Sequence, residues 1–366
     1  MPKKIDLIAA ARPNFMKVAP LFHALSAQPW CEVRLVHTGQ HYDANMSDAF
    51  FADFDLPKPD LHLGIGSGTH AEQTGRTLMA YEQACLADRP DWTIVVGDVN
   101  ATIACALAAS KLHIPVAHLE AGLRSRDRYM PEEINRILTD AIADVLWTPS
   151  IDANENLAAE GIAEQRIEFV GNIMLDTFEL MRGRIESQGK RDELGLSVRE
   201  YAVVTLHRPG NVDSPETLET LVEALVRLST EVTLVFAVHP RTRNRLEQHA
   251  LLERLQAASG MRLIEPQGYI DFMNLVTGAA LTITDSGGMQ EETTYLGIPC
   301  LTVRPTTERP ITVEQGSNRL IGASELLSAA QAVLKGECCY TASRPELWDG
   351  QTAGRIVADL ARRAGK

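Results

Sequence analysis

Strand-like and helix-like segments alternate along most of this 366-residue chain, and this alternation constrains its fold more than any other feature. Short apolar runs such as IDLIAAA, TIVVGD and IPVAHLE are separated by segments with the apolar spacing of helices. This order of elements is typical of parallel sheets whose connecting helices cover both faces. We therefore predict an α/β protein built on parallel sheets.

The alternation is interrupted once and then starts again. The polar stretch ESQGKRDELGLSVRE precedes a second series of apolar runs, YAVVTLH, VTLVFAVH and ALTITD. The length of the chain also suits two cores better than one. We predict two Rossmann-like parallel-sheet domains, residues 1–172 and 173–351, and a C-terminal helix, 352–366, that packs back on the first domain.

The chain has a formal net charge of −13 at pH 7, and no segment is dense in lysine and arginine. Such a chain is a poor candidate for general nucleic-acid binding, so an anionic ligand requires local positive charge. No apolar run reaches transmembrane length, and Asp6 interrupts the short run near the start, which argues against a signal peptide. We expect a cytoplasmic protein that has neither nucleic acid nor membrane as a partner.

Common cofactor motifs are missing from the sequence. The six cysteines form no C-x-x-C pair and no zinc spacing, and several lie in apolar runs typical of buried thiols. The GIGSG run at Gly64 follows no buried strand and lacks the full dinucleotide fingerprint. Walker, H-E-x-x-H and G-x-S-x-G sequences do not occur either. We therefore expect no metal and no cofactor.

Polar residues follow nearly every predicted strand, in both halves of the chain. Parallel sheets bind ligands beyond the carboxyl ends of their strands, so these positions are candidates for a functional site. They are Arg12, with Lys17 on the following helix, Asp98, Glu120, His207, Arg208, His239, Arg241 and the run 285–288. Their number predicts two sheet edges that face each other across a cleft.

Asp98 and Glu120 end consecutive strands. If these strands pair, they lie about 5 Å apart. Two carboxylates this close push each other's pKa values apart, as acid–base chemistry requires. The alternative is that each carboxylate caps a neighbouring loop or helix. Glu132 follows Pro131, and its position alone favours a stabilising acid in the first turn of a helix. Two interpretations of His207 remain, a loop histidine whose hydrogen bonds are satisfied and a functional residue. His239 is a weaker candidate for a functional residue.

The stretch ITDSGGMQEETTYLGIPCL combines an apolar strand, two glycines and a helix. Glycines leave no side chain between the backbone and a ligand, and a helix N-terminus offers free N–H groups to an anion. A tight strand–helix turn explains the same residues. By itself the stretch does not decide between a phosphate cradle and a turn.

Taken together, these segments resemble the non-hydrolysing UDP-N-acetylglucosamine 2-epimerases. The resemblance runs from near Arg12 to near Gly322. It rests on blocks such as ARPNFMKVAPL, VVGDVNATIACALAASKLHIPVAHLEAGLRS, MPEEINRI, VTLHRPGNVD, TDSGGMQEETTYLGIPCLTVRPTTERP and VEQGSNRLIG. It implies the two-domain glycosyltransferase-B architecture with the site in the interdomain cleft, and a homodimer.

The resemblance also implies an activity and a set of residues for it. The activity is inversion of C2 of UDP-N-acetylglucosamine to give UDP-N-acetylmannosamine, by elimination of UDP and its re-addition through a 2-acetamidoglycal. By position, the catalytic set is Lys17, Asp98, Glu120, Glu132 and His207.

A second set of residues is implied for the UDP part of the substrate. The resemblance assigns the diphosphate to 286–288 and the ribose to Glu292. It places Gln267 and Phe272 around the uracil, and Arg12 and Arg309 towards the phosphates. The individual loop residues are Ser286, Gly287 and Gly288.

Two properties differ among the proteins that the chain resembles, namely activation by the substrate and the identity of the sugar. The segment TGQHYDANMS carries Tyr42 and Asp43, where members activated by their substrate have other residues, so we expect no allosteric activation. Related enzymes acting on UDP-diacetamido uronic acids share GQHYD-like segments, and such a sugar is the main alternative substrate. A hydrolysing epimerase, a glycosyltransferase of the same fold and an inactive UDP-sugar sensor are weaker alternatives.

Overall fold

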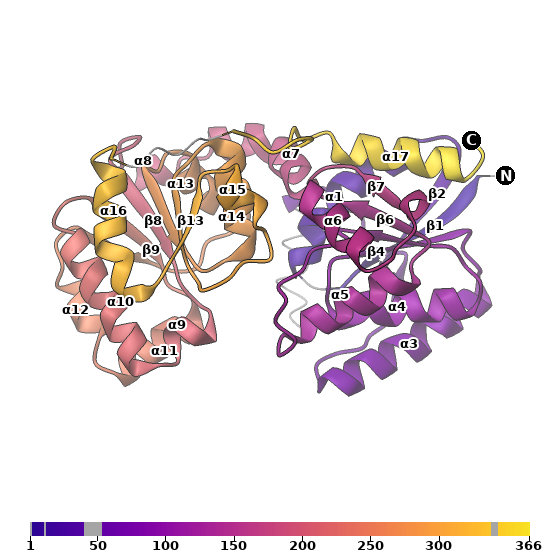
Figure 1. The fold of residues 1–366 in the computed structure, drawn as a ribbon, viewed down its shortest axis with the longest axis horizontal. Helices are drawn as coiled ribbons and strands as arrows, with labels where there is room; N and C mark the ends of the chain where they lie inside the picture. Colours follow the sequence, from indigo (N-terminus) through magenta and orange to yellow (C-terminus); the bar gives the residue numbers. More distant parts are fainter. Residues whose placement is uncertain (1, 11, 40–52, 338–342) are drawn as a thin grey trace. The chain divides into compact units, whose positions relative to one another are not determined.

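The computed structural model describes residues 2–10, 12–39, 53–337 and 343–366, which form two compact units (Figure 1). The first unit comprises residues 1–180 and 346–366, and the second comprises 181–345. The chain passes from one unit to the other inside helix α7, Ile173–Ser187. A boundary within a continuous helix produces no break in composition, so the sequence does not mark it.

The first unit is built on a seven-stranded sheet in which every pair of neighbouring strands is parallel. The strand order is β3-β2-β1-β4-β5-β6-β7. The strands are β1 (Lys3–Ala9), β2 (Cys31–His37), β3 (Leu61–His62), β4 (Trp92–Val96), β5 (Val116–Leu119), β6 (Val145–Thr148) and β7 (Ile167–Phe169).

Helices cover both faces of this sheet, and the alternation of strand side chains explains how. Successive residues of a strand point to opposite faces. Ile94 and Val96 therefore pack with α1 and α17, whereas Val95 packs with α3 and α4. Besides α7, the helices are α1 (Arg12–Ser26), α3 (His70–Ala87), α4 (Asn100–Lys111), α5 (Pro131–Ile142), α6 (Ile151–Ala159), the 3₁₀ turn η1 (Glu164–Arg166) and α17 (Thr352–Arg363).

The C-terminal helix α17 belongs to the first unit although 165 residues of the second unit precede its segment in the chain. It lies against α1 (Figure 1), and Ile356 and Leu360 are fully buried there. Trp147 on β6 donates a hydrogen bond of 2.8 Å from its indole N–H to Asp359. An apolar stripe and buried polar contacts thus hold α17 in place.

The second unit has a six-stranded sheet that is also wholly parallel, with the order β10-β9-β8-β11-β12-β13. Its strands are β8 (Tyr201–Thr205), β9 (Thr233–Ala237), β10 (Met261–Ile264), β11 (Leu281–Thr284), β12 (Cys300–Val303) and β13 (Asn318–Ile321). The predicted class, α/β with two parallel-sheet domains, is therefore confirmed.

Helices separate the strands of the second unit as well. One large core forms where α10, α12 and α16 pack on the sheet. The helices are α8 (Lys190–Glu193), α9 (Pro209–Val212), α10 (Pro215–Leu228), α11 (Pro240–Gln248), α12 (Leu252–Gln256), α13 (Tyr269–Thr277), α14 (Gly287–Leu296), α15 (Ile311–Glu314), the 3₁₀ turn η2 (Ala323–Glu325) and α16 (Leu326–Leu334).

Both sheets reverse the direction in which strands are added, and this locates the expected ligand sites. In the first sheet β1 to β3 extend one way and β4 returns to pair with β1. In the second sheet β11 returns in the same manner to pair with β8. Parallel α/β sheets bind ligands beyond the carboxyl ends of the strands at such switch points.

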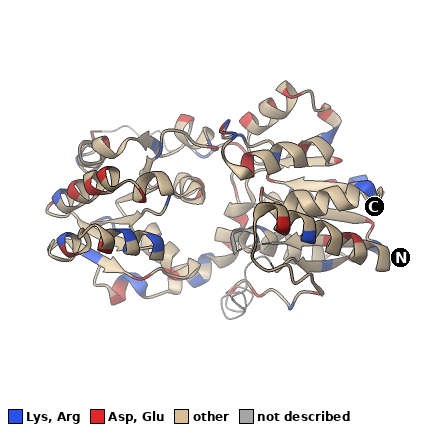
Figure 2. Ribbon diagram, turned by 90° about the horizontal axis from the view of Figure 1, so that it is seen from below, with Lys and Arg blue, Asp and Glu red and all other residues tan. Residues whose placement is uncertain are grey.

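Acidic and basic residues are interspersed over the ribbon of each unit (Figure 2). Within the described parts of the chain, no helix is both long enough and apolar enough to cross a membrane.

Candidate functional site

The carboxyl ends of β4 and β5 lie side by side in the first unit. Val96 pairs with Leu119, so the next residues, Gly97 and Glu120, leave the sheet together. Both have a left-handed backbone, with φ of 66° at Gly97 and 73° at Glu120. This conformation is uncommon for a residue other than glycine, and it is concentrated at functional sites. Strain at Glu120 therefore marks this turn as a candidate site.

Three polar side chains surround Gly97. A β-carbon at this glycine would lie 3.4 Å from Glu120 Oε2 and 3.5 Å from both Lys17 Nζ and Asn14 Nδ2. Lys17 Nζ and Glu120 Oε2 form an ion pair, and the two side chains are only 12% and 7% exposed. Asn14 donates a hydrogen bond of 2.9 Å to the carbonyl of Val96. These are ordinary contact distances, so the left-handed backbone, and not a lack of space, is what favours glycine at this position.

Asp98 has a cationic partner of its own. Arg136 on α5 binds the Asp98 carboxylate through Nη2 and the Glu133 carboxylate through Nη1. Asn135, beside it, donates a hydrogen bond of 2.9 Å to the Asp98 carbonyl. Glu132 is half-buried in the first turn of α5, on the face that carries Asn135 and Arg136 one turn later. Helix α5 thus brings the guanidinium of Arg136 and the amide of Asn135 to the end of β4.

The buried residue of the PEE sequence is Glu133, which supports the site and does not face outwards. Its carboxylate accepts hydrogen bonds of 2.9 Å from the backbone N–H groups of Ser125 and Arg126. Burial favours the neutral acid, but these bonds and the charge of Arg136 hold the pKa of Glu133 below its usual value. No local pattern distinguishes the two glutamates, because only the packing of α5 decides which one is buried.

In the second unit, His207 and Asp285 meet at the ends of β8 and β11. Asp285 is fully buried and accepts hydrogen bonds from the backbone N–H groups of His207 and Arg208, at 2.9 and 2.8 Å. His207 Nδ1 lies 3.0 Å from Asp285 Oδ1. Burial raises the pKa of Asp285, but its interactions with His207 and the Arg208 N–H lower it overall. An ionised Asp285 only accepts, so Nδ1 of His207 donates and Nε2 is the nitrogen left for other chemistry.

The Asp-Ser-Gly-Gly turn opens helix α14. Ser286 occupies the N-cap position, but its side chain makes no capping hydrogen bond. A β-carbon at Gly288 would meet no atom within 4 Å, so the space beside the first turn is open. At Gly287 a β-carbon would lie 2.8 Å from Glu308 Oε1 and 3.1 Å from Arg309 Nη1. The turn therefore combines free N–H groups, open space and a nearby guanidinium, which together suit an anion.

A network of paired guanidinium and carboxylate groups lies next to this helix N-terminus. Glu308 is buried and pairs with Arg304 at 2.8 Å and with Arg309 at 2.9 Å. Arg309 also lies 2.8 Å from Glu291. Burial favours the neutral form of Glu308, but the charges of Arg309 and Arg304 hold its pKa well below the usual range. The two carboxylates fix the orientation of Arg309, so that its guanidinium is held beside Gly287.

Glu292 is buried on the next turn of α14. Burial raises its pKa to about 8, and the hydroxyl of Tyr269 lies beside it and interacts with it. Tyr269 begins α13, which also carries the half-buried Phe272, and Gln267 precedes this helix. Gln267 Nε2 donates to the carbonyl of Glu265 at 2.6 Å. The structure thus brings the start of α13 next to α14.

The predicted residues therefore fall into two groups, one in each unit. Lys17, Asp98, Glu120 and Glu132 belong to the first, and the other described candidates belong to the second. The side chain of Arg12 and the segment with Tyr42 and Asp43 lie outside the described residues. His239, the weaker candidate, caps α11: its Nδ1 accepts the Arg241 N–H at 3.2 Å. Its ring centroid lies 5.6 Å from that of His207.

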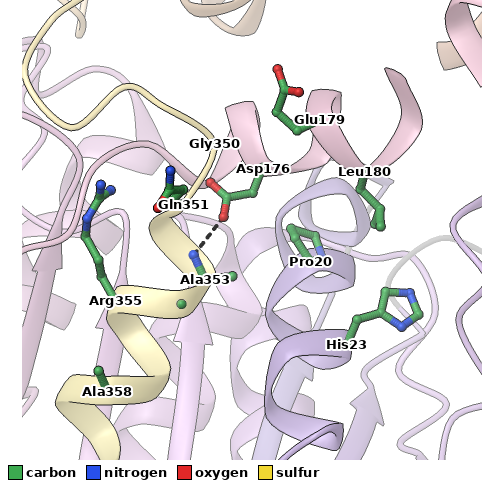
Figure 3. Close-up of a pocket in the computed structure, with 11 residues that line it drawn as sticks. Pro20, His23, Asp176, Glu179, Leu180, Gly350, Gln351, Ala353, Arg355 and Ala358 are labelled. Atoms are coloured by element: carbon green, nitrogen blue, oxygen red, sulfur yellow. Dashed lines mark hydrogen bonds between the residues drawn. The ribbon is translucent and has the colours of Figure 1, made fainter. Parts of the chain in front are cut away.

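A separate cavity of about 580 Å³ lies in the first unit, between α1, α7 and the start of α17 (Figure 3). Asp176 points from α7 towards α17 and accepts a hydrogen bond of 2.8 Å from the backbone N–H of Ala353. Burial raises the pKa of Asp176. None of the residues lining this cavity is among the predicted site residues, so the cavity does not contribute to either group.

Comparison with known proteins identifies the family. A family model described as UDP-N-acetylglucosamine 2-epimerase matches residues 23–361. The chain is 43% identical over 364 residues to the UDP-N-acetylglucosamine 2-epimerase of Methanocaldococcus jannaschii, with 98% of each protein covered. It is also 43% identical over 363 residues to the UDP-2,3-diacetamido-2,3-dideoxy-D-glucuronate 2-epimerase of Pseudomonas aeruginosa, covering 98% of this chain and 99% of that protein.

A solved structure agrees with these matches. The chain resembles the crystal structure of the Methanocaldococcus jannaschii UDP-GlcNAc 2-epimerase in complex with UDP-GlcNAc and UDP, with a TM-score of 0.87 and 41% identity. The likeness covers 98% of this chain and 99% of that one, and it confirms the glycosyltransferase-B-like architecture. Because the matches span nearly the whole sequence, the chain belongs to the UDP-N-acetylglucosamine 2-epimerase family and is an isomerase.

Proposed function

We propose that the chain is a non-hydrolysing epimerase that inverts C2 of UDP-N-acetylglucosamine and gives UDP-N-acetylmannosamine. The observation that carries this proposal is the pair of carboxylates, Asp98 and Glu120, at the carboxyl ends of two paired strands. Each has its own cation, Arg136 or Lys17. The solved relative that holds UDP-GlcNAc and UDP supports the same substrate for this chain.

The chemistry explains why carboxylates and an anion site are both needed. The hydrogen on C2 of the sugar has no adjacent carbonyl to acidify it. When the bond from C1 to the UDP oxygen breaks, positive charge develops at C1 and the C2 proton becomes labile. A carboxylate takes this proton, the C1–C2 double bond of a 2-acetamidoglycal forms, and UDP leaves with the bonding electron pair. Return of a proton to the opposite face of C2 and re-addition of UDP at C1 complete the inversion.

Each group of residues suits one half of this reaction. We assign the diphosphate to the start of α14, where Ser286, Gly287 and Gly288 offer backbone N–H groups beside Arg309. These groups stabilise the negative charge that UDP gains when it leaves. We assign Glu292 to the ribose, Gln267 and Phe272 to the uracil, and Arg12 to the phosphates. His207, oriented by Asp285, is assigned to the reacting end of the nucleotide.

Proton transfer is assigned to the first unit. Asp98, Glu120 and Glu132 are the candidate acids and bases for the two faces of C2. The ammonium of Lys17 favours the ionised carboxylate of Glu120, which is the form that accepts a proton. Arg136 binds the carboxylate of Asp98 and fixes its orientation.

One experiment tests the reaction as a whole. The protein is incubated with UDP-N-acetylglucosamine in D2O, and proton NMR follows the sugar. We expect UDP-N-acetylmannosamine with deuterium at C2, since the proton is removed from and returned to that carbon. Free UDP with free N-acetylmannosamine would identify a hydrolysing epimerase, and deuterium at C3 would contradict the elimination route.

A UDP-2,3-diacetamido uronic acid is the alternative substrate, because the Pseudomonas aeruginosa relative is as similar to this chain as the archaeal one is. The same spectrum with both sugars in one tube compares their kcat/KM values directly. Preferential turnover of the uronic acid would replace the proposed substrate and leave the mechanism unchanged. The resemblance further leads us to propose a homodimer, which sedimentation at low protein concentration tests.

A further inference from the structure

His118 is a fully buried histidine directly below the candidate site, on β5 and two residues before Glu120. Its two ring nitrogens each contact an acceptor. Nε2 lies 2.8 Å from the carbonyl oxygen of Gly97, and Nδ1 lies 2.7 Å from Oδ1 of Asp140 on α5. No sequence motif pointed to His118, because both partners come from other elements of the fold.

The hydrogen bonds determine which protons the ring carries. A carbonyl oxygen only accepts, so Nε2 carries a proton. Asp140 is ionised, since its second oxygen pairs with Arg124 at 2.8 Å and accepts the Gly122 N–H at 3.1 Å. Burial favours its neutral form, but the charges of His118 and Arg124 lower the pKa of Asp140 overall. An ionised carboxylate also only accepts, so Nδ1 carries a proton too and the ring is an imidazolium.

A chain of alternating charges balances this buried cation. Arg124 binds Asp140 and also binds Glu160 through two hydrogen bonds of 2.8 and 2.6 Å. The order is therefore His118, Asp140, Arg124 and Glu160, with two cations and two anions. The chain runs from the carboxyl end of β4 to the end of α6, and its first contact is the backbone of the candidate site.

The contact of His118 fixes the peptide that leads into Asp98. The carbonyl of Gly97 and the N–H of Asp98 belong to one peptide unit. On its other side, the N–H of Gly97 donates to the carbonyl of Leu119 at 3.0 Å. With His118 bound to its carbonyl, Gly97 is held at both ends in its left-handed conformation. The orientation of Asp98 relative to Glu120 then depends on His118.

We propose that His118 is a positioning residue of the epimerase: it holds the turn of Gly97 and Asp98 against that of Glu120 and supplies a buried positive charge beneath both carboxylates. This inference rests on the proposed function, because it assigns the carboxylates to proton transfer. A neutral side chain is enough to fill a core position, whereas a buried cation has a desolvation cost that a purely structural role does not require.

Two substitutions distinguish the effect of the hydrogen bond to Gly97 from the effect of the positive charge on the ring. His118→Asn keeps an N–H near the place of Nδ1 and loses the bond to Gly97. His118→Gln places an amide N–H near the place of Nε2 and keeps that bond. Both remove the positive charge. Tyr81→Phe is the matched control, because the buried Tyr81 hydroxyl donates to Asp6 on β1 at 2.9 Å and also contacts Thr93 near the amino end of β4, away from the candidate site.

The expected results differ among the three variants. His118→Asn lowers kcat by about tenfold to a hundredfold with little change in KM, since small displacements of positioned groups have effects of this size. His118→Gln keeps kcat nearer to the wild-type value. In both, the acidic limb of the pH–rate profile moves to higher pH, because loss of a cation disfavours the ionised carboxylates. The charged groups around the ring are Asp140, Arg124 and Glu160, and those at the site are Asp98, Glu120, Lys17 and Arg136.

Tyr81→Phe is expected to lower stability and to leave kcat and the pH profile unchanged. If the Asn and Gln variants behave like this control, His118 is a structural residue and the proposal is wrong.

A second measurement does not depend on activity or on variants. The ¹⁵N chemical shifts of the imidazole in the wild-type protein report its protonation, and from the two acceptor contacts we expect both nitrogens of His118 to carry a proton at pH 7. A neutral tautomer at pH 7 overturns the proposal. A wild-type protein that epimerises neither UDP-sugar would contradict the proposed function, while the spectrum would still decide the charge of His118.

Discussion

Lys17 and Glu120 form a buried ion pair although 103 positions separate them in the sequence. Lys17 lies on the second turn of α1, and Glu120 leaves β5 in a left-handed conformation. The sheet places β5 next to β4, and β4 next to β1, from which α1 begins. The pair thus joins the two sides of the topological switch point, and it links the strained turn to the helix that covers it.

Lys17→Met tests how much the ion pair of Lys17 and Glu120 contributes to stability and to kcat. Removal of one partner from a buried ion pair leaves an uncompensated charge, which typically costs about 3–5 kcal/mol of stability. We expect a lower free energy of unfolding in denaturant and a lower kcat in the native variant. Lys3→Met removes a more exposed pair with Asp91 and should change stability by about 1 kcal/mol or less. Equal effects of both substitutions would show that the Lys17 pair is not energetically special.

Asp98→Asn and Glu120→Gln test the assignment of proton transfer. Each keeps the shape of the side chain and removes its acid–base function, so kcat should fall by roughly 10²–10⁴-fold. The affinity for UDP, measured by calorimetry, should change little, because the UDP contacts are assigned to the second unit. Asp91→Asn, at the other end of β4, is the control and should keep full activity.

The same two variants can also reveal the order of events. A variant that still eliminates UDP but cannot return a proton to C2 should release UDP and the 2-acetamidoglycal into solution. Chromatography of the reaction mixture detects both products. Near wild-type turnover in both amide variants would mean that the carboxylates only cap neighbouring backbone groups.

Gly288→Val tests the phosphate cradle. The space beside Gly288 is open in the structure, so the added branches would occupy it without disturbing the fold. Loss of one or two charge-assisted hydrogen bonds to the diphosphate should weaken UDP binding by about 1.5–3 kcal/mol each. Gly183→Val, at a helical glycine of the same unit that also has no neighbour within 4 Å, controls for the loss of glycine itself. Wild-type UDP affinity in a folded Gly288→Val protein would refute the cradle.

Glu292 predicts a specific dependence of stability on pH. Burial raises its pKa from 4.5 to about 8 in the folded protein. Between these values the folded state holds a proton that the unfolded state has lost, so stability falls as pH rises from about 4.5 to about 8. Glu292→Gln removes this contribution and should therefore gain stability relative to the wild type across this range. A stability difference that does not change between pH 5 and 8 would contradict the raised pKa.

Several features of the protein follow from the sequence alone. The parallel sheets could be predicted because the period of apolar residues and the glycines between segments act locally, within a few residues. Asp98, Glu120, His207 and Asp285 could be recognised as strand-end residues for the same reason. Their resemblance to family motifs then gave the expected reaction, and the comparisons confirmed the family.

Only the tertiary structure decided how these residues are partnered. Arg136 binds Asp98 and His118 binds Gly97 because β4, β5 and α5 pack together, and no local pattern encodes such contacts. The rotation of α5 decides that Glu133 is buried and that Glu132 is only half-buried. The passage between the units lies inside the continuous helix α7. The spacing of apolar residues indicates which face of a helix or strand is buried. Charge pairing and protonation instead depend on distances between segments that are far apart in the chain.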